Sequence, residues 1–124
     1  QDIIDDLIEK AKANGNACSA VSCYETVVLT ENRTSGKEQI DRNRIVRVQT
    51  PQCYNYGLIK SLYEKADKDN REDFVYANIL AMNYGVEIYF SKGTNNNIKI
   101  TTKDDIALFR ALLYYINNAE GEEN

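Results

Sequence analysis

The sequence of 124 residues predicts an α/β fold, and three observations lead to it. Segments with the apolar spacing of amphipathic helices alternate with short segments rich in β-branched and aromatic residues. A polar turn between two extended segments predicts a projecting two-stranded arm. The remaining strands are fewer than the roughly five or six of an average sheet. We therefore expect a single but partial domain over residues 1–124, with part of its sheet outside this chain.

The first half contains one predicted helix and the arm. Apolar side chains at helical spacing predict a helix over residues 2–13, with acidic side chains in its first turn. Residues 20–29 are rich in Val, Tyr and Thr and predict a strand. Residues 40–50 predict a second extended segment, which Pro51 ends. These two segments and the turn between them make an arm over about residues 26–50.

The second half alternates helices and short strands. Its apolar patterns predict two helices, at residues 55–67 and 74–83, and two short strands, at residues 86–90 and 98–101. Thr102 and Asp105 have the spacing of a capping box, with Asp in place of the usual Glu, and begin a last helix. That helix is expected to bury a stripe formed by Ile106, Phe109, Leu112, Leu113 and Ile116.

Composition excludes several classes of function. The absence of histidine excludes histidine-dependent triads, histidine metal sites and a histidine general base in this chain. The net charge of −4 disfavours a nucleic-acid-binding surface. Cys18, Cys23 and Cys53 lack metal-site spacing and are expected to be reduced thiols. No apolar stretch could span a bilayer, and the acidic N-terminus is unlike a signal peptide, so we expect a cytoplasmic protein without membrane partners.

A few polar residues interrupt otherwise apolar segments and are candidates for chemistry. Glu25 and Thr26 lie at the base of the arm, and Arg42 lies on its returning side. Lys99 lies in a β-branched segment directly before a capped helix, where α/β proteins often bind anions. Lys99 is therefore a candidate phosphate ligand, with a solvent-exposed strand lysine as the alternative. Taken singly, Arg42 and Thr26 are readily explained as ordinary surface residues without a functional role.

The order of these motifs resembles one enzyme family. The motifs are, in order, Glu25-Thr26, the arm, Asp41-Arg42-Asn43, Val48-Gln49-Thr50-Pro51-Gln52 and Asn97-Ile98-Lys99-Ile100-Thr101-Thr102. Their sequence and spacing resemble those of the 2-C-methyl-D-erythritol 4-phosphate cytidylyltransferases, and related ribitol-5-phosphate cytidylyltransferases share most of them. The resemblance runs from the first helix to about Asn117, nearly the whole chain.

The resemblance implies a fold and an activity. The fold would be the C-terminal half of a Rossmann-like α/β/α sandwich of the nucleotide-diphospho-sugar transferase type, whose β-arm joins the subunits of a homodimer. The enzymes transfer CMP from CTP to a sugar-alcohol phosphate and release pyrophosphate, using Mg²⁺. The implied acceptor is 2-C-methyl-D-erythritol 4-phosphate, an isoprenoid precursor. The Mg²⁺ ligands are expected outside this chain.

The resemblance also implies roles for four residues. Arg42 and Lys99 would be catalytic and would hold the acceptor phosphate, with Arg42 reaching into the neighbouring subunit's site. Thr26 and Thr50 would add substrate contacts. The residue types suit this chemistry, because a guanidinium pairs with two phosphate oxygens and a lysine supplies a compact positive charge.

The sequence departs from the family pattern in three places. Glu25 replaces the usual Asp, which is expected to cost little. Residues 75–79 replace an acidic Thr-Asp-Asp/Glu-Ala-Ser motif, unless Glu72 and Asp73 take its place after a shift. The family's glycine-rich CTP loop is absent, so this chain alone is expected to be inactive. Two alternatives stay open: a ribitol-5-phosphate cytidylyltransferase for cell-wall or capsule synthesis, and a catalytically inactive truncated assembly module.

Overall fold

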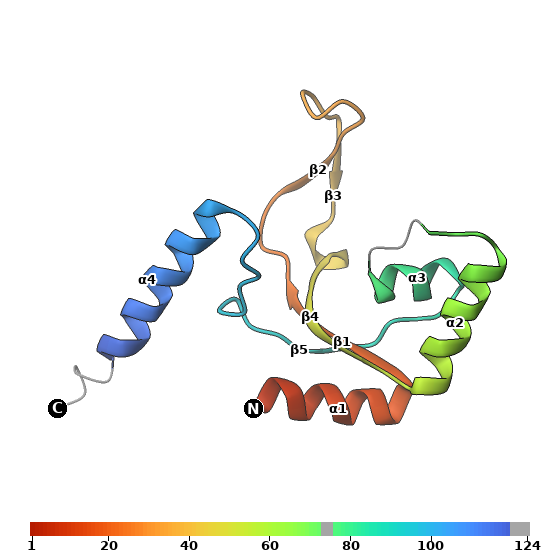
Figure 1. Cartoon of the computed structure of the whole chain (residues 1–124). Helices are drawn as coiled ribbons and strands as arrows, with labels where there is room; N and C mark the ends of the chain where they lie inside the picture. The colour runs from red at the N-terminus through yellow and green to blue at the C-terminus, as the bar shows by residue number, and fades with distance from the viewer. Residues whose placement is uncertain (73–75, 120–124) are drawn as a thin grey trace. The chain divides into compact units, whose positions relative to one another are not determined.

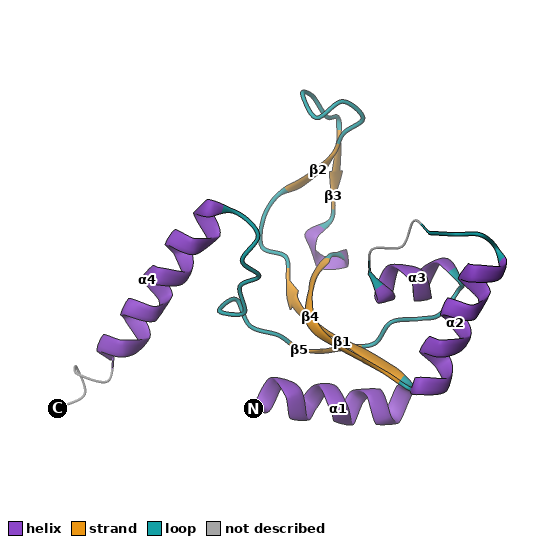
Figure 2. Ribbon diagram, in the orientation of Figure 1, coloured by secondary structure: helices purple, strands orange, loops and turns teal. Residues whose placement is uncertain are grey.

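The structure, a computed structural model, describes residues 1–72 and 76–119. It divides into two compact units, residues 1–93 and residues 94–124. The first unit contains a three-stranded sheet, the helices that cover it and a separate two-stranded hairpin (Figures 1 and 2). The second unit contains α4 (Lys103–Ala119) and the segment that precedes it.

The first unit begins with α1 (Asp2–Asn14), which confirms the helix predicted over residues 2–13. The helix ends at Gly15, whose φ of 87° lies in the left-handed region that glycine tolerates without a Cβ clash. The Gly15 N–H donates to the Ala11 carbonyl at 2.8 Å. The chain then turns directly into β1 (Asn16–Ser22).

β1 is the central strand of the sheet. It pairs antiparallel with β4 (Val46–Tyr54) and parallel with β5 (Phe90–Lys92), in the order β4-β1-β5. Because side chains alternate along a strand, neighbouring residues of β1 face opposite sides of the sheet. Ala17 packs against Leu7 and Ala11 of α1, whereas Cys18 joins the larger core on the other face.

The larger core is formed mainly by two helices, α2 (Tyr56–Lys68) and α3 (Ala77–Asn83). Its buried residues are Cys18, Leu62, Ala66, Leu80, Ala81 and Ile88. α2 confirms the helix predicted over residues 55–67. α3 is shorter than the predicted helix 74–83; residues 74 and 75 of that prediction, together with Asp73, lie outside the described residues.

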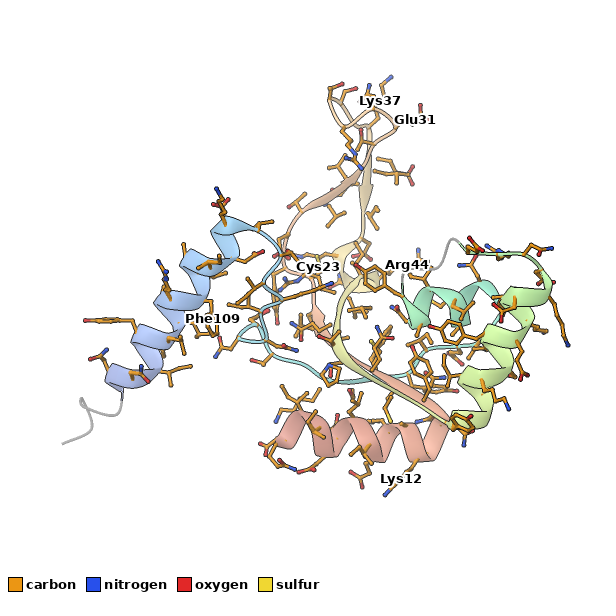
Figure 3. The ribbon with its side chains drawn as sticks, viewed as in Figure 1. Lys12, Cys23, Glu31, Lys37, Arg44 and Phe109 are labelled. Atoms are coloured by element: carbon orange, nitrogen blue, oxygen red, sulfur yellow. The ribbon has the colours of Figure 1, made fainter. Side chains whose placement is uncertain are left out.

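The predicted arm is a hairpin of β2 (Val27–Leu29) and β3 (Glu38–Ile40). Glu31 and Lys37 lie at its tip, away from the sheet (Figure 3). The predicted strand 20–29 was wrong as one element, because residues 23–26 form an irregular link between β1 and β2. The predicted segment 40–50 is likewise divided, since the short 3₁₀ helix η1 (Arg42–Arg44) separates β3 from β4.

β4 also continues past Pro51, which was predicted to end the strand. The ladder is irregular at this point, because the pairing register shifts between Cys18 and Ala20 of β1. Proline lacks an N–H and is tolerated where a strand bulges and the regular ladder is interrupted. The Thr50–Pro51 peptide bond is cis.

The strand predicted at residues 86–90 forms later, at Phe90–Lys92, and one buried side chain explains the shift. Asn16 donates from Nδ2 to the Glu87 carbonyl at 2.9 Å and accepts the Tyr89 N–H on Oδ1 at 3.2 Å. Its amide therefore satisfies backbone groups that a strand ladder would otherwise pair. Regular parallel pairing begins only at Cys18 and Phe90.

In the second unit, the predicted last helix is confirmed as α4, but two other predictions were wrong. Residues 98–101 form no strand, because β-branched residues make a strand only where another strand pairs with them, and no described strand does. The expected buried stripe is largely exposed: Phe109 is 37% accessible and Ile116 49%. The described residues of this unit contain no second helix or sheet that could cover it.

Candidate functional site

Arg42, the predicted catalytic arginine, lies at the base of the hairpin in η1. Asp41 precedes η1 and its carboxylate accepts the Asn43 N–H at 2.9 Å, which starts the 3₁₀ turn. The Arg42 Nη1 donates to the Tyr24 carbonyl at 3.3 Å. This contact spans the two sides of the hairpin base and fixes one edge of an otherwise exposed guanidinium. An arginine held in this way can still donate hydrogen bonds from its other guanidinium N–H groups to an anion.

Glu25 organises the link that Arg42 contacts. Its Oε2 accepts the Tyr24 N–H at 3.1 Å and the Cys23 thiol at 3.4 Å, and lies 3.9 Å from the Arg47 Nε. Hydrogen bonds from its own backbone and from Cys23, together with the charge of Arg47, lower the pKa of Glu25. Glu25 is therefore a carboxylate at neutral pH. Figure 3 shows Cys23 at this hairpin base, near η1, where Arg44 is also labelled.

The two predicted threonines occupy different places in the first unit. Thr26 is exposed and directly precedes β2, so it follows the link that Arg42 contacts. Thr50 is also exposed and lies further along β4, at the register irregularity. The structure thus brings Arg42 to the segment leading into Thr26, and places Thr50 on the strand that continues from η1.

Lys99 belongs to the second unit and is exposed. It lies four residues before α4, in the segment that the capping box ends. The Asp105 Oδ2 accepts the Thr102 N–H at 2.6 Å, and the Thr102 Oγ1 accepts the Asp105 N–H at 3.3 Å. This reciprocal pair confirms the predicted capping box and fixes the direction in which the Lys99 segment enters the helix.

The capping box predicts a pH-dependent helix start. The hydrogen bond from the Thr101 backbone, followed by those from the Thr102 side chain and backbone, lowers the pKa of Asp105 from 3.8 to about 2. The pKa of Asp105 in the folded protein lies below its ordinary value. The Asp105 carboxylate therefore stabilises the start of α4 fully above about pH 4, and this stabilisation is lost as the pH falls towards 2. We expect the ¹³Cα shifts of residues 103–106 to move towards coil values over that range. Asp105→Asn should show the coil-like shifts already at neutral pH, whereas Asp104→Asn should not.

Other chemical features are limited in the described part of the chain. No group of three or more His, Cys, Asp or Glu side chains among residues 1–72 and 76–119 is placed to hold a metal ion. The three cysteines are free thiols, as predicted. No described helix is long and apolar enough to cross a membrane.

A hollow of about 350 Å³ lies within the hairpin loop, lined by residues 29–32 and 35–38, away from the predicted site residues.

Sequence reasoning missed two contacts at this site. Tyr24 acts through its backbone carbonyl, which no side-chain pattern could reveal. Arg47 lies in the alternating segment Val46-Arg47-Val48, and this alternation signals only that it faces away from its neighbours. Its approach to Glu25 depends on how β4 lies beside the link between β1 and β2.

Known proteins resemble this chain in sequence. The family model described as IspD: 2-C-methyl-D-erythritol 4-phosphate cytidylyltransferase matches residues 1–115. A ribitol-5-phosphate cytidylyltransferase of Lacticaseibacillus paracasei is 36% identical over 113 residues, which is 90% of this chain and 48% of that protein. A 2-C-methyl-D-erythritol 4-phosphate cytidylyltransferase of Clostridium novyi is 35% identical over 111 residues, with the same coverage. The chain thus spans about half the length of the curated relatives it matches.

Solved structures resemble it in fold. The 2-C-methyl-D-erythritol 4-phosphate cytidylyltransferase of Thermus thermophilus superposes with a TM-score of 0.77 at 23% identity, over 90% of this chain and 54% of that one. The enzyme of Francisella tularensis gives a TM-score of 0.76 at 26% identity, over 89% and 52%. These matches confirm the predicted α/β fold class. With a family match over 115 of 124 residues, the chain belongs to the 2-C-methyl-D-erythritol 4-phosphate cytidylyltransferase family.

Proposed function

We propose that the protein containing this chain transfers CMP from CTP to a sugar-alcohol phosphate. An acceptor phosphate oxygen attacks the α-phosphorus of CTP, the bond to the β-phosphate oxygen breaks, and pyrophosphate leaves. The observation that carries the proposal is the family match over residues 1–115, which includes all four predicted site residues. Such a reaction needs positioning and charge neutralisation more than proton transfer, in keeping with a chain that has no histidine.

In this proposal, the chain supplies the acceptor side of the reaction. Arg42 and Lys99 are the catalytic cations and hold the acceptor phosphate, while Thr26 and Thr50 contribute hydroxyl contacts. The hydrogen bond from Arg42 to the Tyr24 carbonyl supports this role, because an arginine anchored on one edge loses less conformational freedom when it binds an anion. The CTP loop and the Mg²⁺ ligands are proposed to lie outside this chain.

The acceptor is proposed to be 2-C-methyl-D-erythritol 4-phosphate, with ribitol 5-phosphate as the second candidate. The relative that is 36% identical carries the ribitol-5-phosphate name, and the relative that is 35% identical carries the methylerythritol-phosphate name, so each candidate has a specific observation in its favour. Both acceptors present a phosphate monoester to the same cations and differ in the polyol.

A pyrophosphate-release assay tests the proposal. The protein is expressed from its full reading frame and supplied with CTP, Mg²⁺ and one of the two polyol phosphates. We expect turnover with 2-C-methyl-D-erythritol 4-phosphate and a kcat/KM at least about tenfold lower with ribitol 5-phosphate, as expected when one site hydroxyl or methyl contact is mismatched. A reversed preference would establish the ribitol-5-phosphate enzyme. No release with either acceptor would favour the inactive assembly module.

We also propose that the hairpin joins two copies of the protein in a cytoplasmic homodimer, without nucleic-acid or membrane partners. Exposed apolar side chains on the hairpin support this, because Val28 and Leu29 are 47% and 55% accessible. Light scattering of the protein measures the assembly directly, and a monodisperse monomer would contradict the dimer.

A further inference from the structure

The strand β4 is irregular at Thr50, where its pairing with β1 changes register. Cys18 of β1 pairs with Gln52, whereas Ala20 of β1 pairs with Val48. Ser19 alone therefore faces residues 49–51, so β4 bulges away from its partner strand at this point. A bulge re-aims the side chains that it carries, and here it carries the exposed Thr50.

The side of the bulge that follows Thr50 is held by a chain of hydrogen bonds. The Tyr54 hydroxyl donates to the Gln52 Oε1 at 2.8 Å. The Gln52 Nε2 then donates to the Asn78 Oδ1 of α3 at 3.4 Å. Asn78 is only 6% accessible, although asparagine is usually exposed. A buried amide needs hydrogen-bond partners, and the Gln52 Nε2 supplies one to the Asn78 Oδ1.

Tyr54 fixes the orientation of the Gln52 amide. Burial, followed by the neighbouring Cys18 and Tyr63, raises the pKa of Tyr54 well above its ordinary value. Tyr54 therefore remains a hydroxyl donor at any physiological pH. Because it donates to Oε1, the NH₂ end of Gln52 must face Asn78.

The side of the bulge that precedes Thr50 is held from β1. The Cys18 thiol lies 3.3 Å from the Gln49 carbonyl and donates to it. Burial raises the pKa of Cys18 to about 11, so the thiol keeps its proton at neutral pH. Residues 49 and 52 are thus both restrained by buried side chains of the first unit, and Thr50 lies between them.

We propose that Asn78 and Tyr54 are positioning residues that act through Gln52 to hold Thr50 where it contacts the acceptor phosphate. This rests on the proposed function, in which Thr50 binds the substrate. Neither residue touches the acceptor. Their effect is to keep the bulge in one arrangement, so that the Thr50 hydroxyl is already in place when the acceptor arrives.

The experiment compares variants of the protein expressed from its full reading frame. Asn78→Leu removes the acceptor of the Gln52 amide and keeps a side chain branched at Cγ, and Tyr54→Phe removes a single hydroxyl. Each is expected to raise the KM for the polyol phosphate roughly five- to tenfold, as for one lost neutral hydrogen bond, with kcat and the KM for CTP changed less than about twofold. Asn78→Asp keeps an acceptor oxygen and should restore most of the affinity.

A matched control separates positioning from stability. Asn83 lies on the same helix and is exposed, and its Nδ2 donates to the Ile79 carbonyl of α3 at 2.9 Å. Asn83→Leu should leave both KM values unchanged. The Gln52 side-chain ¹⁵N–¹H₂ signals provide a second readout, because they should shift in Asn78→Leu and Tyr54→Phe and not in Asn83→Leu.

Thr50→Ala distinguishes failure of this inference from failure of the proposed site. If Thr50→Ala leaves the acceptor KM unchanged, the role of Thr50 in the proposed function is wrong. If Thr50→Ala raises that KM but Asn78→Leu and Tyr54→Phe do not, the positioning inference is wrong. If the inference is right, Asn78→Leu adds nothing further in the Thr50→Ala background, because both changes remove the same contact.

Discussion

Replacing Arg42 with alanine is expected to lower kcat by a factor of about 10² to 10³, the range seen when one charge-stabilising donor is removed from an active site. The reason is geometric as well as electrostatic. Arg42 is anchored to the Tyr24 carbonyl at 3.3 Å, so its charge is presented from a fixed point at the hairpin base. Lys99→Ala is expected to have an effect of the same size, since it removes the second cation that we propose holds the acceptor phosphate.

The measurement is steady-state pyrophosphate release at saturating CTP and acceptor, with protein expressed from its full reading frame. Lys37→Ala and Lys103→Ala are the matched controls, because they remove an equal charge at the hairpin tip and in the first turn of α4. Both controls should keep kcat within about twofold of the parent. Turnover close to the parent value in Arg42→Ala or in Lys99→Ala would remove that residue from the catalytic site.

Leu80→Ala is expected to lower the free energy of unfolding by about 2–5 kcal/mol, the cost of truncating a fully buried leucine and leaving a cavity. Leu80 is 0% accessible and lies in the core that joins α2 and α3 to the sheet. The loss is a large part of the stability of an ordinary small domain, so the variant should unfold at a markedly lower urea concentration.

Urea unfolding followed by circular dichroism measures this loss. Met82 lies two residues further along α3 and is 48% accessible, so Met82→Ala makes a similar truncation on the exposed side of the same helix. It should change the unfolding free energy by less than about 1 kcal/mol. Equal losses in the two variants would mean that α3 does not pack on the sheet through Leu80.

The helices α1 and α2 were predictable because part of their apolar spacing coincides with their packing. Leu7 and Ala11 of α1, and Leu62 and Ala66 of α2, are buried as their spacing indicates. The strands were less predictable, because a strand also requires a partner. Residues 86–89 have strand-like composition, yet the Asn16 amide takes their backbone groups and delays β5 to Phe90. A side chain 71 residues away in sequence cannot be inferred from local composition.

The sequence motifs name candidate residues for the site, which remain predictions, but they do not give the contacts around those residues. The motif order identified Arg42, Thr26, Thr50 and Lys99, and the family match covers all four positions. The contacts that position them come from elsewhere: a backbone carbonyl at Tyr24, a carboxylate at Glu25 and a buried amide at Asn78. None belongs to a pattern with a characteristic spacing: the Glu25 contact is local, whereas the Tyr24 and Asn78 contacts join residues 18 and 26 positions apart.

The central position of β1 has a consequence for the order in which the chain folds. β1 pairs with β4, which begins more than twenty residues later, and with β5, which ends at Lys92. Only the hairpin of β2 and β3 can pair locally within the intervening chain. Because distant pairings carry a loop-closure cost before they gain contacts, this cost is smaller for the hairpin than for the sheet. On the ribosome, both strands of the arm therefore emerge about fifty residues before β5, the strand that completes the sheet from which the arm projects.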